Sequence, residues 1–566
     1  MLCNDNNTKL RISMISVALM ASLFAALFCL SCGGGKKENI QPWPDGGGGG
    51  GDAGTDAAQD GGDADGDGDG DTDGDSDGDS DTDTDADGDA DNGAYQWHTF
   101  YGSNSGGTSI VRDGSGNIYV TGTAGASWNG PSGQSPLHAY SANSGDHDIV
   151  VLKLDSSGAY QWHTFYGDGD DYSCGRSLAL DGSGNIYVTG GSGASWNGPS
   201  GESPLHAFSG SSAEANFFIL KLDSSGAYLW HTFYGSGDEA NGGRSLALDV
   251  SGHIYVAGVS GASWNGPSGE SPLNAFSGSS YSSDRFILKL DSSGAYQWHT
   301  FYGAGGETDD PCSLALDGSG NIYVTGGSHA SWNGPSGESP LHAYSGDGDI
   351  VLLKLDSSGA YQWHTFYGSD SSGLSLAIDG SGNFYISGVS DASWNGPAGQ
   401  SPLHAFAGTG PADSGIVIQN IVVLKLDPSG AYEWHTFYGP DEWYAYGISS
   451  AIDGNGNLYM TGVSLASWNG PSGESPLHAF SGTGVTDAGG PFYDIFVLKL
   501  NSSGAYKWHT FYGSDSVDEG LSLTVDTSGN LYVTGSSEAS WNGPSGESPL
   551  HAFQEGGDIV VIKTKQ

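Results

Sequence analysis

Short apolar stretches with the character of β-strands recur along most of the chain. In one copy they are SLALD (residues 177–181), NIYVTG (185–190), FFILKLD (217–223) and YLWHTFYG (228–235). Successive side chains of a strand point to opposite faces, so Leu220 and Leu222 share one face and Lys221 lies on the other. Gly-rich DGSGN and DSSG segments separate the first two and the last two stretches and suit tight turns. Each copy therefore predicts four short antiparallel strands.

Two sequence markers recur seven times each. Trp-His pairs begin at Trp97, Trp162, Trp230, Trp298, Trp363, Trp434 and Trp508. Trp-Asn-Gly-Pro segments begin at Trp128, Trp196, Trp264, Trp332, Trp394, Trp468 and Trp541. Successive Trp-His pairs lie 65 to 74 residues apart. Seven copies of a four-stranded unit predict an all-β fold, a seven-bladed β-propeller of antiparallel blades, because radial repetition leaves only short, protected sheet edges.

The two ends of the array predict how the ring closes. The array starts with the last strand of a blade, residues 95–102, and finishes with a third strand, residues 558–564. We therefore expect the N-terminal strand to pair with residues 558–564 and to complete the seventh blade.

The hallmarks DGSGNIYVTG and DIVVLKLDSSGAYQWHTFYG resemble the SBBP, or seven-bladed beta-propeller, repeat family. The resemblance covers residues 93–566. It departs after the second strand, where such repeats often carry a short Asp-Phe-Pro turn and this chain has SWNGPSGESPLHAF. Bacterial members of that family are mostly exported surface proteins, so the resemblance implies a fold and a location but no particular activity.

The first residues predict an export signal of the lipoprotein type, residues 1–31. Lys9 and Arg11 precede an apolar run, residues 12–30, and small residues surround Cys32. The Leu-Ser-Cys ending resembles a bacterial lipobox, which implies lipidation of Cys32 and a membrane anchor. Gly33 after this Cys, by resemblance to enterobacterial sorting, favours the outer membrane or cell surface of a Gram-negative-type bacterium. An uncleaved signal anchor is the alternative, since this run is just long enough to span a bilayer.

Residues 32–92 predict a disordered linker. From residue 45 the segment is almost wholly Gly, Asp, Ala, Thr and Ser, which have little apolar surface to bury and repel one another. Its alternating aspartates also match the first half of a calcium-binding loop, at Asp69, Asp71, Asp73, Asp75 and Asp77. The twelfth positions, however, are Ser80 and Thr84 instead of the Glu that such loops need. The sequence favours a solvated spacer over weak, multi-site calcium association, and it indicates no other cofactor.

Charge and cysteine content narrow the range of functions. The formal net charge is −49, and most basic residues of the propeller region are one repeated Lys per copy, so no basic patch favours nucleic-acid binding. Cys174 and Cys312 lie in the second and fourth repeats, which are not neighbours in a ring. We expect both to be isolated thiols.

The long connections after the second and fourth strands all belong to one end of the ring. We therefore expect the seven SWNGPSGESPLHAF inserts and variable loops such as residues 209–217, 235–243 and 440–447 to gather on that end. The inserts offer Trp, Asn, Ser and His, which suit stacking and hydrogen bonding to sugar rings. The favoured alternative is that the insert Trp residues wedge between blades. The candidate ligand-binding residues are the seven insert Trp named above with Asn129, Asn197, Asn265, Asn333, Asn395, Asn469 and Asn542.

Other candidate chemistry is weaker. The histidines of the Trp-His pairs lie one per blade, so we expect them to pack against neighbouring strands instead of binding metal. Six Leu-His pairs (His138, His206, His342, His404, His478 and His551) have Asn274 at the seventh position. The strongest departures from the repeat, residues 168–171, 307–310 and 443–446, are predicted to be solvated loops.

These observations lead to a non-enzymatic surface protein, a multivalent binding or adhesion scaffold for glycan or another cell-surface polymer. The alternatives are a propeller enzyme acting on polysaccharide and a passive structural coat protein. No asymmetric set of catalytic residues is recognisable in the sequence. The sequence leaves the ligand and the oligomeric state open.

Overall fold

The computed structural model describes residues 93–565 except 142–145, 170–171, 211–215, 237–240, 279–281, 306–308, 409–417 and 483–491. The side chains of residues 309–312 also lie outside this description. So do the predicted signal and linker, with Cys32, Asp69, Asp71, Asp73, Asp75 and Asp77. Every regular element of the described residues is a β-strand. No helix in these ranges is long and apolar enough to cross a membrane.

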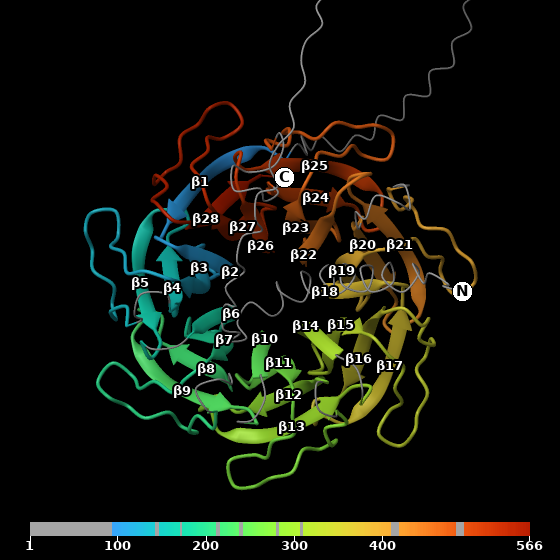
Figure 1. The fold of residues 1–566 in the computed structure, drawn as a ribbon, viewed down its shortest axis with the longest axis horizontal. Helices are drawn as coiled ribbons and strands as arrows, with labels where there is room; N and C mark the ends of the chain where they lie inside the picture. The colour runs from blue at the N-terminus through green and yellow to red at the C-terminus, as the bar shows by residue number, and fades with distance from the viewer. Residues whose placement is uncertain are drawn as a thin grey trace, which may run out of the picture. The chain divides into compact units, whose positions relative to one another are not determined.

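The strands form seven four-stranded antiparallel blades around a central axis (Figure 1). The innermost strands are β2 (Ser105–Arg112), β6 (Ser173–Leu180), β10 (Asn241–Leu248), β14 (Asp309–Leu316), β18 (Ser371–Ile378), β22 (Ala445–Ile452) and β26 (Asp518–Val525). The second strands are β3 (Ile118–Ala124), β7 (Ile186–Ser192), β11 (Ile254–Ser260), β15 (Ile322–Ser328), β19 (Phe384–Ser390), β23 (Leu458–Ser464) and β27 (Leu531–Ser537).

The third strands are β4 (Asp148–Leu154), β8 (Asn216–Leu222), β12 (Asp284–Leu290), β16 (Asp349–Leu355), β20 (Asn420–Leu426), β24 (Asp494–Leu500) and β28 (Asp558–Thr564). The outermost strands are β5 (Tyr160–Tyr166), β9 (Tyr228–Tyr234), β13 (Tyr296–Tyr302), β17 (Tyr361–Tyr367), β21 (Tyr432–Tyr438), β25 (Tyr506–Tyr512) and β1 (Tyr95–Tyr101). We number the blades in chain order, from blade 1 (β2 to β5) to blade 7 (β26 to β28 with β1).

Ring closure follows the prediction from the sequence. β1 pairs antiparallel with β28, with Tyr101 opposite Ile559 and Phe100 opposite Val560. The first strand of the propeller thus becomes the outermost strand of its last blade, and the expected seven-bladed all-β fold is confirmed.

The innermost strands are longer than the sequence pattern predicted. β6 begins at Ser173, four residues before the expected start, and its first residues pair with the end of β7. The register shifts between Gly175 and Ser177, as at a β-bulge. The apolar alternation begins only after this irregularity, whereas backbone pairing needs no apolar side chain. The expected loops 235–243 and 440–447 are shorter for the same reason, because β10 and β22 start within them.

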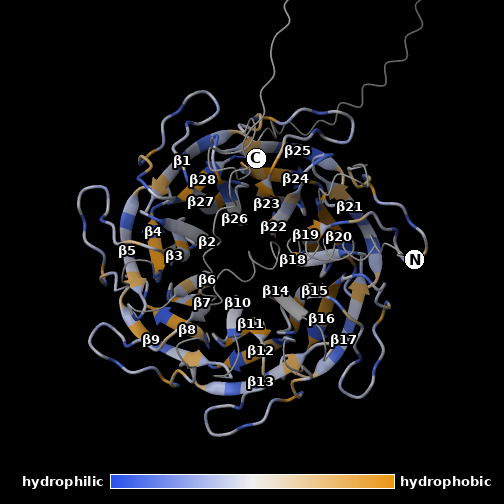
Figure 2. Ribbon diagram, in the orientation of Figure 1, coloured by the Kyte–Doolittle hydropathy of each residue, from blue (hydrophilic) through white to orange (hydrophobic). Residues whose placement is uncertain are grey.

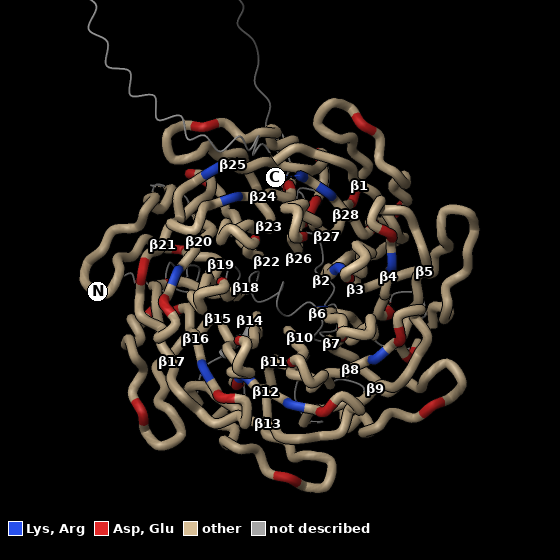
Figure 3. Tube along the Cα trace, turned by 180° about the vertical axis from the view of Figure 1, so that it is seen from behind, with Lys and Arg blue, Asp and Glu red and all other residues tan. Residues whose placement is uncertain are grey.

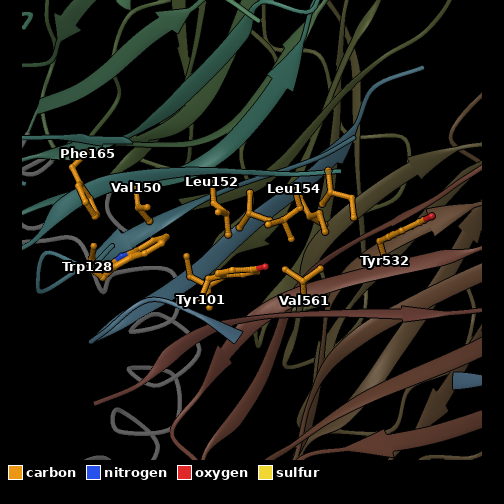
Figure 4. Packing of buried hydrophobic residues seen from close by; sticks show 13 residues of the cluster. Tyr101, Trp128, Val150, Leu152, Leu154, Phe165, Tyr532 and Val561 are labelled. Atoms are coloured by element: carbon orange, nitrogen blue, oxygen red, sulfur yellow. The ribbon is translucent and has the colours of Figure 1, made fainter. Parts of the chain in front are cut away.

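The hydrophobic core lies between neighbouring blades. Figure 4 shows one such cluster, in which Val150 and Leu152 of blade 1 lie near Val561 and Tyr532 of blade 7. Hydrophobic residues concentrate along the middle strands of the blades, and the outer loops are mostly polar (Figure 2). Each blade buries both faces of its third strand, so these strands stabilise the ring by removing apolar surface from water.

A ring of serine hydroxyls joins the blades near the axis. In six of the seven contacts a Leu or Ser N–H of one inner strand donates to a Ser Oγ of the preceding blade, as Leu178 does to Ser109 at 3.2 Å and Leu523 to Ser449 at 3.2 Å. The seventh contact, from the Ile110 N–H to Ser522 Oγ at 3.3 Å, links blade 1 back to blade 7. The repeated Ser therefore supports closure as well as local pairing.

The closing interface has an ion pair that the other interfaces lack at that position. Arg112 of β2 lies 3.1 Å from Asp526, and its guanidinium lies 4.2 Å from the ring centroid of Tyr532. The other inner strands end with an aliphatic residue where β2 ends with Arg112: Leu180, Leu248, Leu316, Ile378, Ile452 and Val525.

Cys174 forms a disulfide, so the expectation of an isolated thiol is wrong for this residue. Its side chain is fully buried on the inner strand β6. The side chain of Cys312 is outside the described part of the chain.

Candidate functional site

The seven insert Trp residues are buried. Their exposed fractions run from 3% at Trp196 to 8% at Trp394. Trp128 lies in the core cluster beside Phe165 (Figure 4), and its ring stacks on His163 with centroids 3.7 Å apart and planes 9° apart. The other six insert Trp stack on the equivalent His in the same way. Because the indole faces are occupied, the structure presents none of them to a sugar ring.

The histidines of the Trp-His pairs hold the inserts in place. In blade 1, His163 Nε2 lies 3.1 Å from the carbonyl oxygen of Trp128, and Nδ1 lies 2.7 Å from the Tyr160 hydroxyl. Burial lowers the pKa of His163 to about 4, so its ring is neutral at pH 7. The same two bonds recur at His98, His231, His299, His364, His435 and His509. The expectation of packing histidines is confirmed.

The inserts lie around the rim instead of gathering on one end of the ring. Each folds over the outermost strand of its own blade and forms the peripheral loops of Figure 1. The Leu137 N–H donates to the His163 carbonyl at 2.9 Å, and the Phe165 N–H donates to the His138 carbonyl at 3.2 Å. The outermost strand has an edge of unpaired backbone groups, and the insert satisfies them. The need to pair these backbone groups places the inserts on the rim, and the sequence pattern alone does not reveal it.

The His of the Leu-His pairs is part of the same covering. His138 Nδ1 lies 2.7 Å from the Phe165 carbonyl oxygen, and its ring stacks on Tyr166 with centroids 5.1 Å apart. Asn274, which replaces this His in blade 3, donates from Nδ2 to the Phe301 carbonyl at the same distance, 2.7 Å. The exchange conserves the hydrogen bond, which explains why the seventh member can be Asn.

A groove crosses the rim between blades 1 and 2. It has a volume of about 400 Å³. Leu137, His138 and Tyr166 of blade 1 form one wall, and the insert tip and β8–β9 turn of blade 2 form the other. The second wall consists of Pro199, Ser200, Glu202, Ser225, Gly226, Ala227 and Tyr228.

The contact at the floor of this groove recurs at every blade junction. Leu137 packs over Gly226 of the next blade, where a Cβ would lie only 2.6 Å from Leu137 Cδ1, so the repeated Gly is needed. Equivalent Leu–Gly contacts are Leu205–Gly294, Leu273–Gly359, Leu341–Gly430, Leu403–Gly504, Leu477–Gly93 and Leu550–Gly158. These seven Leu side chains are 49% to 56% exposed. The rim therefore repeats one half-exposed apolar contact surface seven times.

Polar groups border the groove. The Ser200 N–H donates to Glu202 Oε2 at 2.8 Å. Backbone hydrogen bonds from Glu202 and Ser200 hold the pKa of this exposed carboxyl below its usual value, so it is charged at pH 7. Five inserts carry Glu at this position and two carry Gln134 or Gln400. Figure 3 shows acidic residues on several of the peripheral loops.

The candidate Asn residues next to the insert Trp residues differ from them in exposure. All seven are exposed: Asn129, Asn197, Asn265, Asn333, Asn395, Asn469 and Asn542. They remain candidates for ligand contact, whereas the groove residues Leu137 and Tyr228 are not among the residues that the sequence indicated. The sequence signal that could have indicated them is an apolar Leu at the same position of every insert, followed by His in six copies and by Asn274 in the seventh.

The loop end of blades 5 and 6 departs from the repeat. Tyr446 is 5% exposed and belongs to a cluster with Val389 and Tyr493, so residues 443–446 are not a purely solvated loop. The Tyr446 hydroxyl donates to Gln419 Oε1, and the hydroxyls of Tyr444 and Tyr493 lie 3.1 Å apart. Trp443, by contrast, is 40% exposed. Part of this loop therefore packs against the blades through the aromatic side chains of Tyr444 and Tyr446.

Metal-binding groups do not converge in the described ranges, where no three His, Cys, Asp or Glu side chains are placed to hold one ion. The turn aspartates bind their own backbone instead. Asp113 Oδ1, for example, accepts from the Ser115 and Asn117 N–H groups, each at 2.9 Å.

The fold and the repeated rim define a class of protein, the β-propellers built of seven closely similar blades. A family model for the SBBP beta-propeller repeat matches residues 297–331 and 507–540. These matches and the seven blades of the structure support the resemblance to the SBBP repeat family.

Among characterised proteins, the chain is similar to the regulatory protein FlaEY of Caulobacter vibrioides, with 30% identity over 220 residues. The match covers 39% of this chain and 21% of that protein. Among solved structures, BamB from Moraxella catarrhalis is similar with 13% identity and a TM-score of 0.33, over 83% of this chain and 99% of that one. A polysaccharide lyase, an ulvan lyase, is similar with 11% identity and a TM-score of 0.37, over 78% and 92%. Likenesses at these scores carry no information about activity.

Proposed function

We propose that the protein is a non-enzymatic binding scaffold on the cell surface, tethered through a lipid on Cys32, whose rim binds a repetitive polymer such as a glycan. The observation that carries this proposal is the groove between blades 1 and 2 and the recurrence of its Leu–Gly contact at all seven junctions. A site copied seven times around one ring suits a ligand that also repeats.

Multivalency supplies the affinity in this proposal. One shallow groove of mixed polarity binds a sugar unit weakly, but several grooves on one rigid ring engage one polymer with much greater avidity. The exposed Glu at five groove tips and the net charge of −49 disfavour acidic polymers. The proposed ligand class is therefore a neutral or cationic surface polymer.

The disulfide at Cys174 supports the proposed export. Disulfides persist in oxidising compartments such as the periplasm and the cell surface, and they are rare in the bacterial cytosol. This agrees with the export signal predicted at the N-terminus.

The test is retention of the full chain on immobilised neutral polysaccharides, with and without calcium. The variant replaces all seven rim Leu (Leu137, Leu205, Leu273, Leu341, Leu403, Leu477 and Leu550) by Ser. We expect retention to be lost while melting temperature and circular dichroism show an intact propeller. The matched control is Val250→Ser, because Val250 is a fully exposed apolar residue in a turn away from the rim grooves.

Retention that is unchanged in the seven-site variant contradicts the proposal. Release of shortened polymer by the wild-type chain would also contradict it, because a scaffold leaves its ligand intact. Replacing a single Leu should reduce retention only slightly, since six grooves remain, and a complete loss from one substitution would exclude multivalent binding.

A further inference from the structure

Each blade has a row of three paired residues at its loop end, polar except for Ala124 in blade 1 and Ala445 in blade 6. The row contains the first residue of the inner strand, the last residue of the second strand and the first residue of the third strand. In blade 7 these are Asp518, Ser537 and Asp558, which pair directly across β26, β27 and β28. Both Asp side chains are fully buried. Blade 7 thus places two buried carboxyl groups in the blade that closes the ring.

A third buried carboxyl group adjoins this row from blade 6. Asp494, the first residue of β24, is fully buried. A Cβ on Gly513 would lie 2.7 Å from Asp494 Oδ1 and 3.0 Å from Asp518 Oδ2, so both carboxyls line one small space between the blades. Ser481 donates to Asp494, and Ser514 and Ser537 donate to Asp518.

Asp558 has fewer donors than its equivalents. In blade 4, the Ser345 N–H and O–H donate to the two oxygens of Asp349 at 2.8 and 2.5 Å. Gln554 replaces this Ser in blade 7, and its N–H donates to Asp558 Oδ2 at 2.7 Å. Asp558 Oδ1 is buried and has no hydrogen-bond partner. An ionised carboxylate is therefore poorly supported at this position.

Asp558 also lies at the seam of the ring. The next residue, Ile559, pairs with Tyr101 of β1, and the preceding Gly557 carbonyl accepts from the Ser105 N–H of β2 at 2.9 Å. Ionisation of the Asp558 carboxyl group would therefore affect both β1, which completes blade 7, and β2, which begins blade 1.

The charged neighbours of these carboxyls are acids as well. In addition to burial, the negative charge of Asp515 contributes to raising the pKa of Asp494, and that of Asp494 contributes to raising the pKa of Asp518. Glu519 of β26 lies beside the row with its carboxylate bound by Ser536, and exposed Glu538 and Glu555 follow β27 and precede β28. The second residue of the third strand is a fully buried cation in blade 3, Arg285, but it is Ile495 in blade 6 and Ile559 in blade 7. Protons are then the available means of reducing negative charge in blade 7.

We propose that the row of Asp494, Asp518 and Asp558 is a proton-dependent latch on ring closure, which holds β1 in blade 7 in acid and loosens it above neutral pH. This inference is independent of the proposed rim binding. Burial raises the pKa of Asp494 to about 6 and the pKa values of Asp518 and Asp558 to about 7.

Protonation of these carboxyls stabilises the closed ring at low pH. An Asp carboxyl of the unfolded chain titrates near pH 4, so carboxyls that keep their protons to higher pH stabilise the closed form fully below about pH 4. That stabilisation falls as the pH rises and is lost once the pH has passed through 6 to 7. Turn residues such as Asp113 act in a different window: burial raises its pKa, but hydrogen bonds from Asn117 and Ser115 lower it overall.

The test is hydrogen exchange of the β1 amides in the full chain at pH 5 and pH 8, corrected for the intrinsic pH dependence of exchange. We expect protection of β1 to be at least about tenfold lower at pH 8, since one pKa unit corresponds to a factor of ten. In the Asp518→Asn, Asp558→Asn double variant the difference should be clearly smaller than in the wild type, and the remaining Asp494 and Glu519, whose pKa values burial also raises, account for the rest. Asn already occupies these positions in other blades, at Asn241 and at Asn216 and Asn420.

Asp349→Asn in blade 4 is the matched control, and it should retain the tenfold difference in β1 because its row does not touch the seam. Equal protection of wild-type β1 at both pH values would overturn the proposal, as would an equal loss of the difference in the control. Restoration of protection at pH 8 by millimolar calcium would overturn it in favour of a cation. The wild-type comparison tests the latch even if a variant does not fold.

Discussion

The rim and the loop end of blade 7 are built from copies of the same repeat, yet they differ in what their residues do. On the rim, the same contacts recur at every junction, from the stacked Trp–His pair to the Leu–Gly contact. At the loop end, each blade has its own set of Ser, Asn, Ala or Asp, and only some are paired by matching donors. Repetition marks positions used for packing, and variation marks positions where charge and chemistry differ between blades.

Ring closure sharpens this difference. The non-covalent closure of the ring lies within blade 7, where β28 pairs with β1, and the adjacent interface between blades 7 and 1 differs from the other interfaces. It has an ion pair where the other blades have aliphatic residues, and the buried acids of blade 7 lie beside it. Two departures from the repeat thus lie where the ring is joined, and four substitutions test how far the two regions differ.

Trp196→Ala should have the largest effect. Trp196 is 3% exposed and stacks on His231 with centroids 3.9 Å apart, so its removal leaves a cavity that costs about 3 to 5 kcal/mol. The control, Trp443→Ala, removes a Trp that is 40% exposed and should cost less than about 1 kcal/mol. Thermal and denaturant unfolding measure both. Similar losses in the two variants would remove the distinction between copied and varied positions.

Arg112→Leu tests the closing interface. Leu stands at this position in blades 2 to 4, but here the change removes the ion pair to Asp526 and the contact with the Tyr532 ring. Both charged side chains are partly buried, so we expect a loss of about 1 kcal/mol, smaller in high salt. Val525→Leu at the equivalent position of blade 7 is the control and should change the melting temperature little. A neutral Arg112→Leu variant would mean that closure needs no special interface.

Gln554→Ser should stabilise the protein, and only at high pH. The Ser hydroxyl would supply Asp558 Oδ1 with the donor that Ser345 gives Asp349, which favours the ionised form and lowers the pKa of Asp558 from about 7. The expected gain is about 1 kcal/mol at pH 8, where the carboxyl is ionised, and close to zero at pH 5, where it keeps its proton. Unfolding curves at the two pH values measure it. An equal gain at both would show that the hydroxyl acts without the carboxyl.

His138→Asn should have the smallest effect. Asn274 already makes the hydrogen bond that His138 makes, both at 2.7 Å, so only the stacking on Tyr166 is lost. We expect a change below about 1 kcal/mol. His138→Ala, which removes the hydrogen bond as well, is the comparison, and it should be clearly less stable in the same melts. If Asn and Ala behave alike, the repeated hydrogen bond does not stabilise the rim.

The sequence by itself determined the seven-bladed fold, the four strands of each blade and the pairing of the N-terminal strand with the last one. These follow from local alternation, Gly-rich turns and the count of a repeat, which are all properties of short segments. The packing role of the Trp-His histidines also followed, since one per blade cannot meet around a metal.

Only the tertiary structure decided where the inserts lie and which of their residues are exposed. Seven nearly identical inserts suit packing and ligand binding equally well, so the sequence around Trp128 could not distinguish these two roles. The structure distinguishes them, because each insert covers the exposed edge of an outermost strand and its Trp is buried there. The disulfide of Cys174 likewise depends on a second Cys that is distant in sequence, since every other Cys is far from it along the chain. Such a contact forms only when the chain has folded, and no single repeat encodes it.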